Sequence, residues 1–230
     1  MESNTCIAKH NALALNFLIL FLIFMNKRFV WNFEINTNNT LEIPVVENFV
    51  QSPNHWESRF FWPQDQIVTL NGLNDDFLHL SHYQIKHRHD TYYLLPNADY
   101  NLKTRHDQLF YKPILMKKPQ AIAYAKKIKL DDEADLQFAG YEDKGITALI
   151  NHIKSHGQKI TVEKEALIYR FDTIPTIKLE LAWLNVANKS YLSASIESRS
   201  FSLVESITRQ LLGDLPTSDY VSFLGKLRDE

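Results

Sequence analysis

Apolar and polar side chains alternate along most of this chain, which is the pattern of β-strands with one buried and one polar face. The alternation is clearest over residues 55–62, 86–112, 159–172, 176–186 and 191–198. Two further strands are expected at 29–35 and 41–46, and a hairpin is expected over 67–80 around an Asn71-Gly72 turn. The sequence therefore predicts a largely antiparallel sheet.

The spacing of apolar residues changes to a helical period in four places. These are residues 119–130, 146–153, 203–211 and 220–227. The first two predict a helical insertion at about 117–157, with Gly157 as its C-terminal signal. Strands with flanking helices predict the α+β class, as a single domain over residues 26–230.

Several predicted strands carry charges on their polar face. Lys86, Arg88 and Asp90 share one face, Lys103 shares a face with Arg105, and a glutamate interrupts the strand of residues 176–186. A dry, empty face lined with such charges would be unstable, because the cations repel and each loses its hydration. The face is therefore either solvated, as in an open sheet, or it surrounds a polyanion inside a closed β-barrel.

Composition narrows the class of partner. With 230 residues, of which 45% are hydrophobic, the chain can bury a substantial core. Its net charge of -2 argues against a general nucleic-acid binder, so no nucleic-acid partner is expected and any basic patch is local. Cys6 has no second cysteine to pair with, which fits a reducing, cytoplasmic location.

Residues 1–25 form an apolar N-terminal extension that leaves three readings open. The run at 11–25 is shorter than the roughly 20 residues of a membrane-spanning helix. It is expected to be a dispensable extension before a start at Met25, a membrane anchor, or a signal segment. Membrane contact is expected only if residues 11–25 are native.

From His55 to Leu212, the order of the charged motifs resembles that of the CYTH, or triphosphate tunnel metalloenzyme, superfamily. The opening Glu-x-Glu-x-Lys strand of that family is similar to His55-x-Glu57-x-Arg59. Further motifs follow in the family's order: Asp90-Thr91-Tyr92-Tyr93, Lys103-x-Arg105, Leu109-Phe110-Tyr111-Lys112-Pro113, the basic residues Lys164 and Arg170, and the acidic residues Glu180 and Glu197.

This resemblance implies a closed antiparallel β-barrel, or tunnel, that binds a triphosphate-containing small molecule or polyphosphate. It implies metal-dependent hydrolysis of inorganic triphosphate or an organic triphosphate, with Mg²⁺ or Mn²⁺ held by Glu57, Glu180 and Glu197. The implied catalytic residues are Glu57, Arg59 and Lys112. The implied substrate-binding residues are Arg59, Arg88, Lys103, Arg105, Lys112, Lys164 and Arg170.

Two departures from the family pattern favour an alternative function. His55 stands where the family has its first glutamate, and Trp183 stands near a usual acidic position. The alternative is a non-catalytic module that binds polyphosphate or a nucleotide. A separate possibility is zinc binding by His87 and His89, which share a strand face, although no cysteine or acidic partner has the spacing of a zinc motif.

Overall fold

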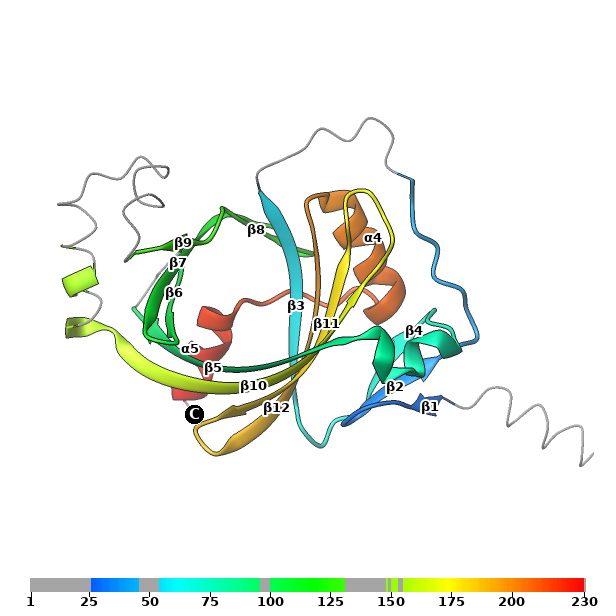
Figure 1. The fold of residues 1–230 in the computed structure, drawn as a ribbon, viewed down its shortest axis with the longest axis horizontal. Helices are drawn as coiled ribbons and strands as arrows, with labels where there is room; N and C mark the ends of the chain where they lie inside the picture. Colours follow the sequence, from blue (N-terminus) through cyan, green and yellow to red (C-terminus); the bar gives the residue numbers. More distant parts are fainter. Residues whose placement is uncertain are drawn as a thin grey trace, which may run out of the picture.

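Eight antiparallel strands close into a ring in the computed structural model, which describes residues 26–45, 54–95, 100–130, 148, 150–152 and 155–229 (Figure 1). Around the ring the order is β6 (Tyr100–Arg105), β5 (Gln84–Leu94), β10 (Gln158–Arg170), β11 (Lys178–Val186), β12 (Lys189–Ser198), β3 (His55–Pro63), β8 (Ile122–Tyr124) and β7 (Gln108–Lys117). Pairing of β7 with β6 closes the ring, and β9 (Ile128–Lys129) pairs with β7. The predicted closed barrel is confirmed, and the open-sheet alternative is wrong.

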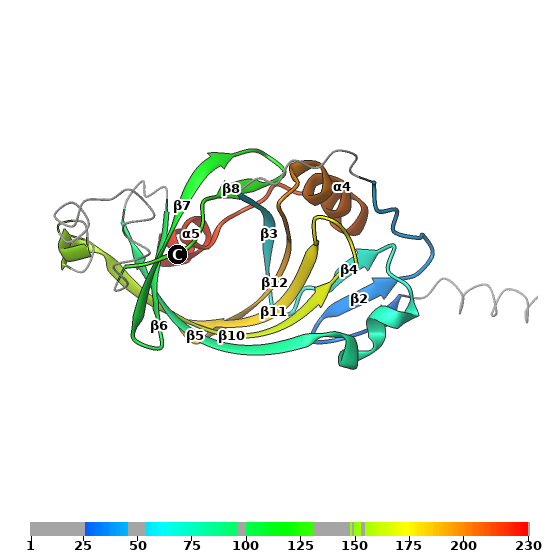
Figure 2. The ribbon, with the colours of Figure 1, turned by 45° about the horizontal axis from the view of Figure 1, so that its top comes forward.

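A second layer covers the outside of the barrel on one side (Figure 2). It consists of α4 (Phe201–Leu212) and a small sheet of β1 (Lys27–Arg28), β2 (Phe33–Asn36) and β4 (Val68–Asn71). The outward apolar residues of β11 and β12 pack against this layer and form the largest core cluster with it. Because strand side chains alternate, this burial turns the intervening residues of both strands toward the lumen.

Helix α5 (Tyr220–Asp229) lies within the ring in both views (Figures 1 and 2). Its buried residues Tyr220, Phe223 and Leu224 form a second core cluster with lumen-facing apolar residues of β5, β10 and β11. The rings of Phe223 and Phe61 stack with centroids 3.9 Å apart. This helix therefore fills one end of the barrel.

The helix predicted over residues 119–130 is wrong. Ile122–Tyr124 instead forms β8, which pairs with both β3 and β7, and all three residues of β8 are buried. The facing edges of β3 and β7 need partners for their backbone N–H and C=O groups, and β8 supplies them. Tertiary pairing thus overrides the helical spacing of the alanine and isoleucine residues.

The predicted hairpin over residues 67–80 is also wrong. β4 ends at Asn71 and pairs in parallel with β2, and two short 3₁₀ helices follow, Asp75–Leu78 and Leu80–His82. Gly72 has a φ of 81°, and its carbonyl accepts a hydrogen bond from Leu41 N–H. This hydrogen bond anchors the start of the segment that begins at Leu41. A strand was predicted over 41–46, but residues 41–45 form none, and residue 46 lies outside the described residues.

The other predicted elements agree with the structure, apart from the segment at 29–35, where only Phe33–Asn36 forms a strand. The long strands and the helices at 203–211 and 220–227 are confirmed. Residues 148, 150–152, 155 and 156 are helical, whereas the rest of the 146–153 prediction and residues 1–25 lie outside the described residues. Within the described ranges, no helix has the length and apolar character needed to span a membrane.

Candidate functional site

The side chains on the inner face of the barrel change from apolar at one end to charged at the other. The end that holds α5 is apolar, with Phe61 and Leu184 against the helix. Further along several strands, the inward positions become charged or hydroxylated, as at Arg59 and its cross-strand partner Ser195. At the far end Lys178 pairs across the strands with Arg170 on one side and Glu197 on the other.

Arg59 is the centre of one charged wall, formed by β3, β11 and β12. Its Nε donates to Glu57 Oε1 at 2.6 Å, and its Nη1 and Nη2 each lie 3.2 Å from Glu180 Oε1. The residue is 3% exposed, and burial alone would lower its pKa, but the nearby charge of Glu57 raises the pKa above the usual value. Arg59 therefore stays charged and ties three strands together, with Glu197 3.8 Å away.

Two lysines also contact the buried carboxylates. Lys112 Nζ lies 3.0 Å from Glu57 Oε2, and Lys164 Nζ lies 2.9 Å from Glu180 Oε1. Burial would raise the pKa of both carboxyls, but the charges of Lys112 and Lys164, together with Arg59, outweigh it and lower both pKa values. Both glutamates are therefore ionised at neutral pH.

Asp90 organises the opposite wall. Lys103 Nζ lies 2.7 Å from Asp90 Oδ2, while Arg105 donates through Nε and Nη2 at 2.5 and 2.6 Å. Burial acts to raise the pKa of Asp90, and hydrogen bonding from Arg105 and the charge of Lys103 lower it further than burial raises it. One carboxylate thereby fixes two cationic side chains of β6 at the lumen.

The pKa of Lys103 is lowered to about 7. Burial is the main cause, the charge of Asp90 opposes it, and Arg105 and Lys164 add repulsion. Its Nζ also donates to the Tyr92 hydroxyl at 3.1 Å. The charge of Lys103 therefore depends on pH near neutrality and on any anion placed beside it.

The two walls enclose a cavity of about 240 Å³. Among the described residues, eight cationic side chains line it against three carboxylates. The cations are Arg59, Arg88, Lys103, Arg105, Lys112, Lys127, Lys164 and Lys178, and the carboxylates are Glu57, Glu180 and Glu197. Even with Asp90 added to the acidic side, positive charge is in excess, so the cavity favours an anion.

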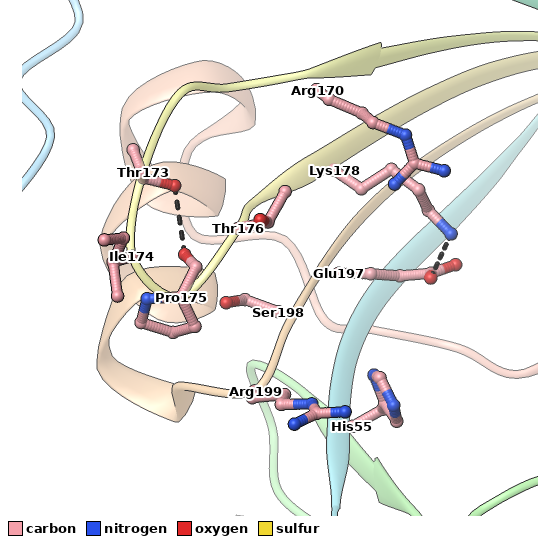
Figure 3. A pocket seen from close by; sticks show the side chains of 10 residues that line it. All are labelled: His55, Arg170, Thr173, Ile174, Pro175, Thr176, Lys178, Glu197, Ser198 and Arg199. Atoms are coloured by element: carbon pink, nitrogen blue, oxygen red, sulfur yellow. Dashed lines mark hydrogen bonds and ion pairs between the residues drawn. The ribbon is translucent and has the colours of Figure 1, made fainter. Parts of the chain in front are cut away.

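Nine of the ten residues that the sequence analysis placed in the site line this cavity. The tenth, Arg170, lies instead in an adjoining hollow of about 630 Å³ at the open end of the barrel (Figure 3). His55 also lies in that hollow, so it does not replace a carboxylate inside the cavity. Burial and the charge of Arg199 lower the pKa of His55.

Six lining residues were not among the predicted site residues: Tyr92, Asn101, Phe110, Lys127, Lys178 and Tyr220. Tyr92 and Phe110 appeared in the sequence analysis only as members of the family motifs. Lys178 carried a usable signal, since it shares a strand face with Glu180. Lys127 was missed because its segment was assigned to a helix. Tyr220 belongs to a short amphipathic helix, whose sequence does not indicate that it enters a barrel.

The three carboxylates of the cavity do not form a preassembled site for Mg²⁺ or Mn²⁺. Glu57 and Glu180 are each bound by a lysine and by Arg59, and Glu197 forms an ion pair with Lys178. Within the described parts of the chain, no three His, Cys, Asp or Glu side chains are grouped closely enough to hold a metal ion. A cation would have to compete with these ammonium and guanidinium groups.

The histidines of β5 form no zinc site with the described residues either. His87 and His89 project from the outside of the barrel, where their side chains are 74% and 66% exposed. Each faces one glutamate of β10, Glu165 and Glu163 respectively, at 3.9 and 3.8 Å. These contacts are exposed cross-strand pairs, which contribute little to stability.

Comparison with models of known protein families finds no match, and comparison with curated proteins finds none either.

Proposed function

We propose that this chain is a CYTH-like module whose barrel binds a linear triphosphate or polyphosphate. The observation that carries this function is the convergence of eight cationic side chains from six strands and one loop on a single enclosed cavity. A chain of linked phosphates carries several charges in a row, and a lumen with cations on facing walls matches that distribution.

The arrangement of the cations supports a ligand with several anionic groups. Arg59, Lys112 and Lys164 lie by the wall of β3, β11 and β12, whereas Lys103 and Arg105 are held at β6 by Asp90. A ligand with a single carboxylate would contact the cations of one wall only. A phosphate chain offers oxygens in several directions and can accept from both walls.

The cavity's enclosure supports a small molecule over a nucleic acid. Its cationic groups lie inside the barrel, and a cavity of about 240 Å³ does not admit a duplex. The chain as a whole is slightly acidic, with a net charge of -2. The order of the charged motifs and the closed barrel together support the resemblance to the CYTH superfamily, including its triphosphate-binding role.

Hydrolysis of the bound triphosphate is a second candidate. It is favoured by the placement of Glu57, Glu180 and Glu197 on adjacent strands of one wall, with Arg59 and Lys112 beside them. These carboxylates already form ion pairs with lysine and arginine side chains, which favours phosphate binding without a metal ion. We therefore assign binding as the primary function.

Calorimetric titration with tripolyphosphate separates the two functions. We expect saturable binding in the presence of EDTA, because the cations need no metal to neutralise the ligand. A phosphate-release assay with Mg²⁺ or Mn²⁺ is expected to give the same rate for the wild-type protein and for Glu57→Ala. Release that depends on metal and on Glu57 would establish the second function, and no binding under any of these conditions would refute both.

The same titration can also measure how many protons the protein takes up when the ligand binds. This number depends on the protonation of Lys103. With a pKa of about 7, this lysine is mostly neutral at about pH 8. A bound polyanion favours the charged ammonium, so binding takes up a proton and affinity falls as the pH rises above neutrality. Titrations in two buffers of different ionisation enthalpy measure this uptake, which is expected to disappear in Lys103→Gln.

A further inference from the structure

The barrel has one closed end and one open end. At the closed end, Phe223 stacks on Phe61, and Tyr220 stacks on Tyr92 with ring centroids 5.1 Å apart. Leu224 of the same helix is fully buried among lumen-facing side chains. A ligand in the cavity must therefore enter, and leave, through the other end.

Tyr220 forms part of the cavity wall where α5 begins. The face of its ring lies 4.9 Å from Arg59 Cζ and 5.5 Å from Lys164 Nζ. The residue is 7% exposed, and its hydroxyl has no hydrogen-bond partner among the described residues. A buried hydroxyl without a partner costs stability, and it could donate a hydrogen bond to an anionic oxygen beside it.

Asn101 gives a second buried polar atom without a partner at the same cavity. Its side-chain oxygen is unsatisfied within the described parts of the chain, and the residue is 9% exposed. Asn101 pairs across the strands with Lys112. The Asn101 oxygen is an acceptor and cannot pair with a phosphate oxygen, so the Tyr220 hydroxyl is the unsatisfied group at this cavity that can donate to an anion.

Toward the open end, the cavity adjoins the hollow that contains Arg170 and Arg199 (Figure 3). Lys178 and Glu197, which form an ion pair, line both spaces and mark the boundary between them. Within the described residues, neither Arg170 nor Arg199 takes part in an ion pair. The basic surface thus extends outward beyond the inner cavity.

We propose that the barrel is a blind cup that binds the end of a linear polyphosphate, with Tyr220 contacting the terminal phosphate and Arg170 and Arg199 contacting phosphates nearer the mouth. This inference rests on the proposed function and adds to it the part of the ligand that is bound. A blind cup admits a chain end and excludes the middle of a chain, and a cyclic phosphate has no end phosphate to place beside Tyr220.

Stoichiometry against chain length tests the blind cup. A linear chain has two ends, so each long polyphosphate chain is expected to bind at most two protein molecules, whatever its length. Cyclic trimetaphosphate, which has no end, is expected to bind much more weakly than linear tripolyphosphate. A protein-to-chain ratio that rises with chain length, or equal affinity for the cyclic and linear compounds, would overturn the inference while leaving polyphosphate binding intact. Absence of binding to any phosphate would instead refute the proposed function.

Two variants locate the ends of the bound chain. Tyr220→Phe keeps the ring and its packing but removes the hydroxyl, and it is expected to weaken tripolyphosphate binding about tenfold. Arg199→Gln is expected to weaken binding of a long chain by a larger factor than binding of tripolyphosphate, and Arg209→Gln, on the outer helix α4, serves as its control. Unchanged affinity in Tyr220→Phe, or an equal loss for both ligands in Arg199→Gln, would contradict the assigned orientation.

Discussion

Replacement of Arg59 by methionine is expected to lower the free energy of unfolding by about 3–5 kcal/mol. Arg59 is 3% exposed, and its guanidinium contacts Glu57 and Glu180, both of which are also buried. Methionine preserves much of the side-chain volume but leaves the carboxylates with fewer cations to balance them. Denaturant unfolding of the ligand-free protein measures the loss.

Arg209→Met is the matched control for this substitution. Arg209 also forms ion pairs, with Glu205 and Asp214, but its side chain is 56% exposed and solvent screens these contacts. We expect no measurable change in stability for this variant. If Arg59→Met unfolded at the same denaturant concentration as the wild-type protein, the Arg59 network would not hold the barrel strands together.

Loss of two cations that face the cavity is expected to reduce tripolyphosphate affinity by about 100-fold or more. Arg88 and Lys112 are the appropriate pair, because their side chains are 20% and 27% exposed and are less deeply buried than Arg59. The variant Arg88→Met/Lys112→Met should therefore retain the fold better than a change at Arg59. Its affinity is measured by the same calorimetric titration.

The control for the double variant must change the net charge equally. Lys189→Met/Lys226→Met also removes two positive charges, and both of these lysines are exposed and lie outside the lining of the cavity. If affinity depended only on the overall charge of the protein, the two double variants would bind equally weakly. We expect the control to bind as the wild-type protein does, apart from a small electrostatic effect that salt screens.

The placement of charges on the strands was predictable from the sequence, because alternation is a local property. Glu57 and Arg59 share a face wherever β3 pairs, and the same holds for Lys103 and Arg105 of β6. The apolar residues between them identified which face would be buried outside the lumen. The grouping of nine cavity residues from strands far apart in sequence went beyond these local rules and came from the resemblance to the CYTH superfamily.

The features that depend on distant pairing were not predictable in the same way. β8 has helical spacing in its sequence, yet it is a strand because it bridges β3 and β7. The apolar stripe of α5 indicates burial but does not specify the inside of a barrel as the place. The blind end, and with it the role of Tyr220, follows only from the assembled fold.

A crystal structure of the protein soaked with tripolyphosphate and Mn²⁺ tests the central claim most directly. The account predicts one elongated ligand inside the barrel, with an end phosphate beside Tyr220 and oxygens in contact with Arg88, Lys103, Arg105 and Lys112. A ligand bound only on the outer surface, with the lumen free of phosphate, would contradict it.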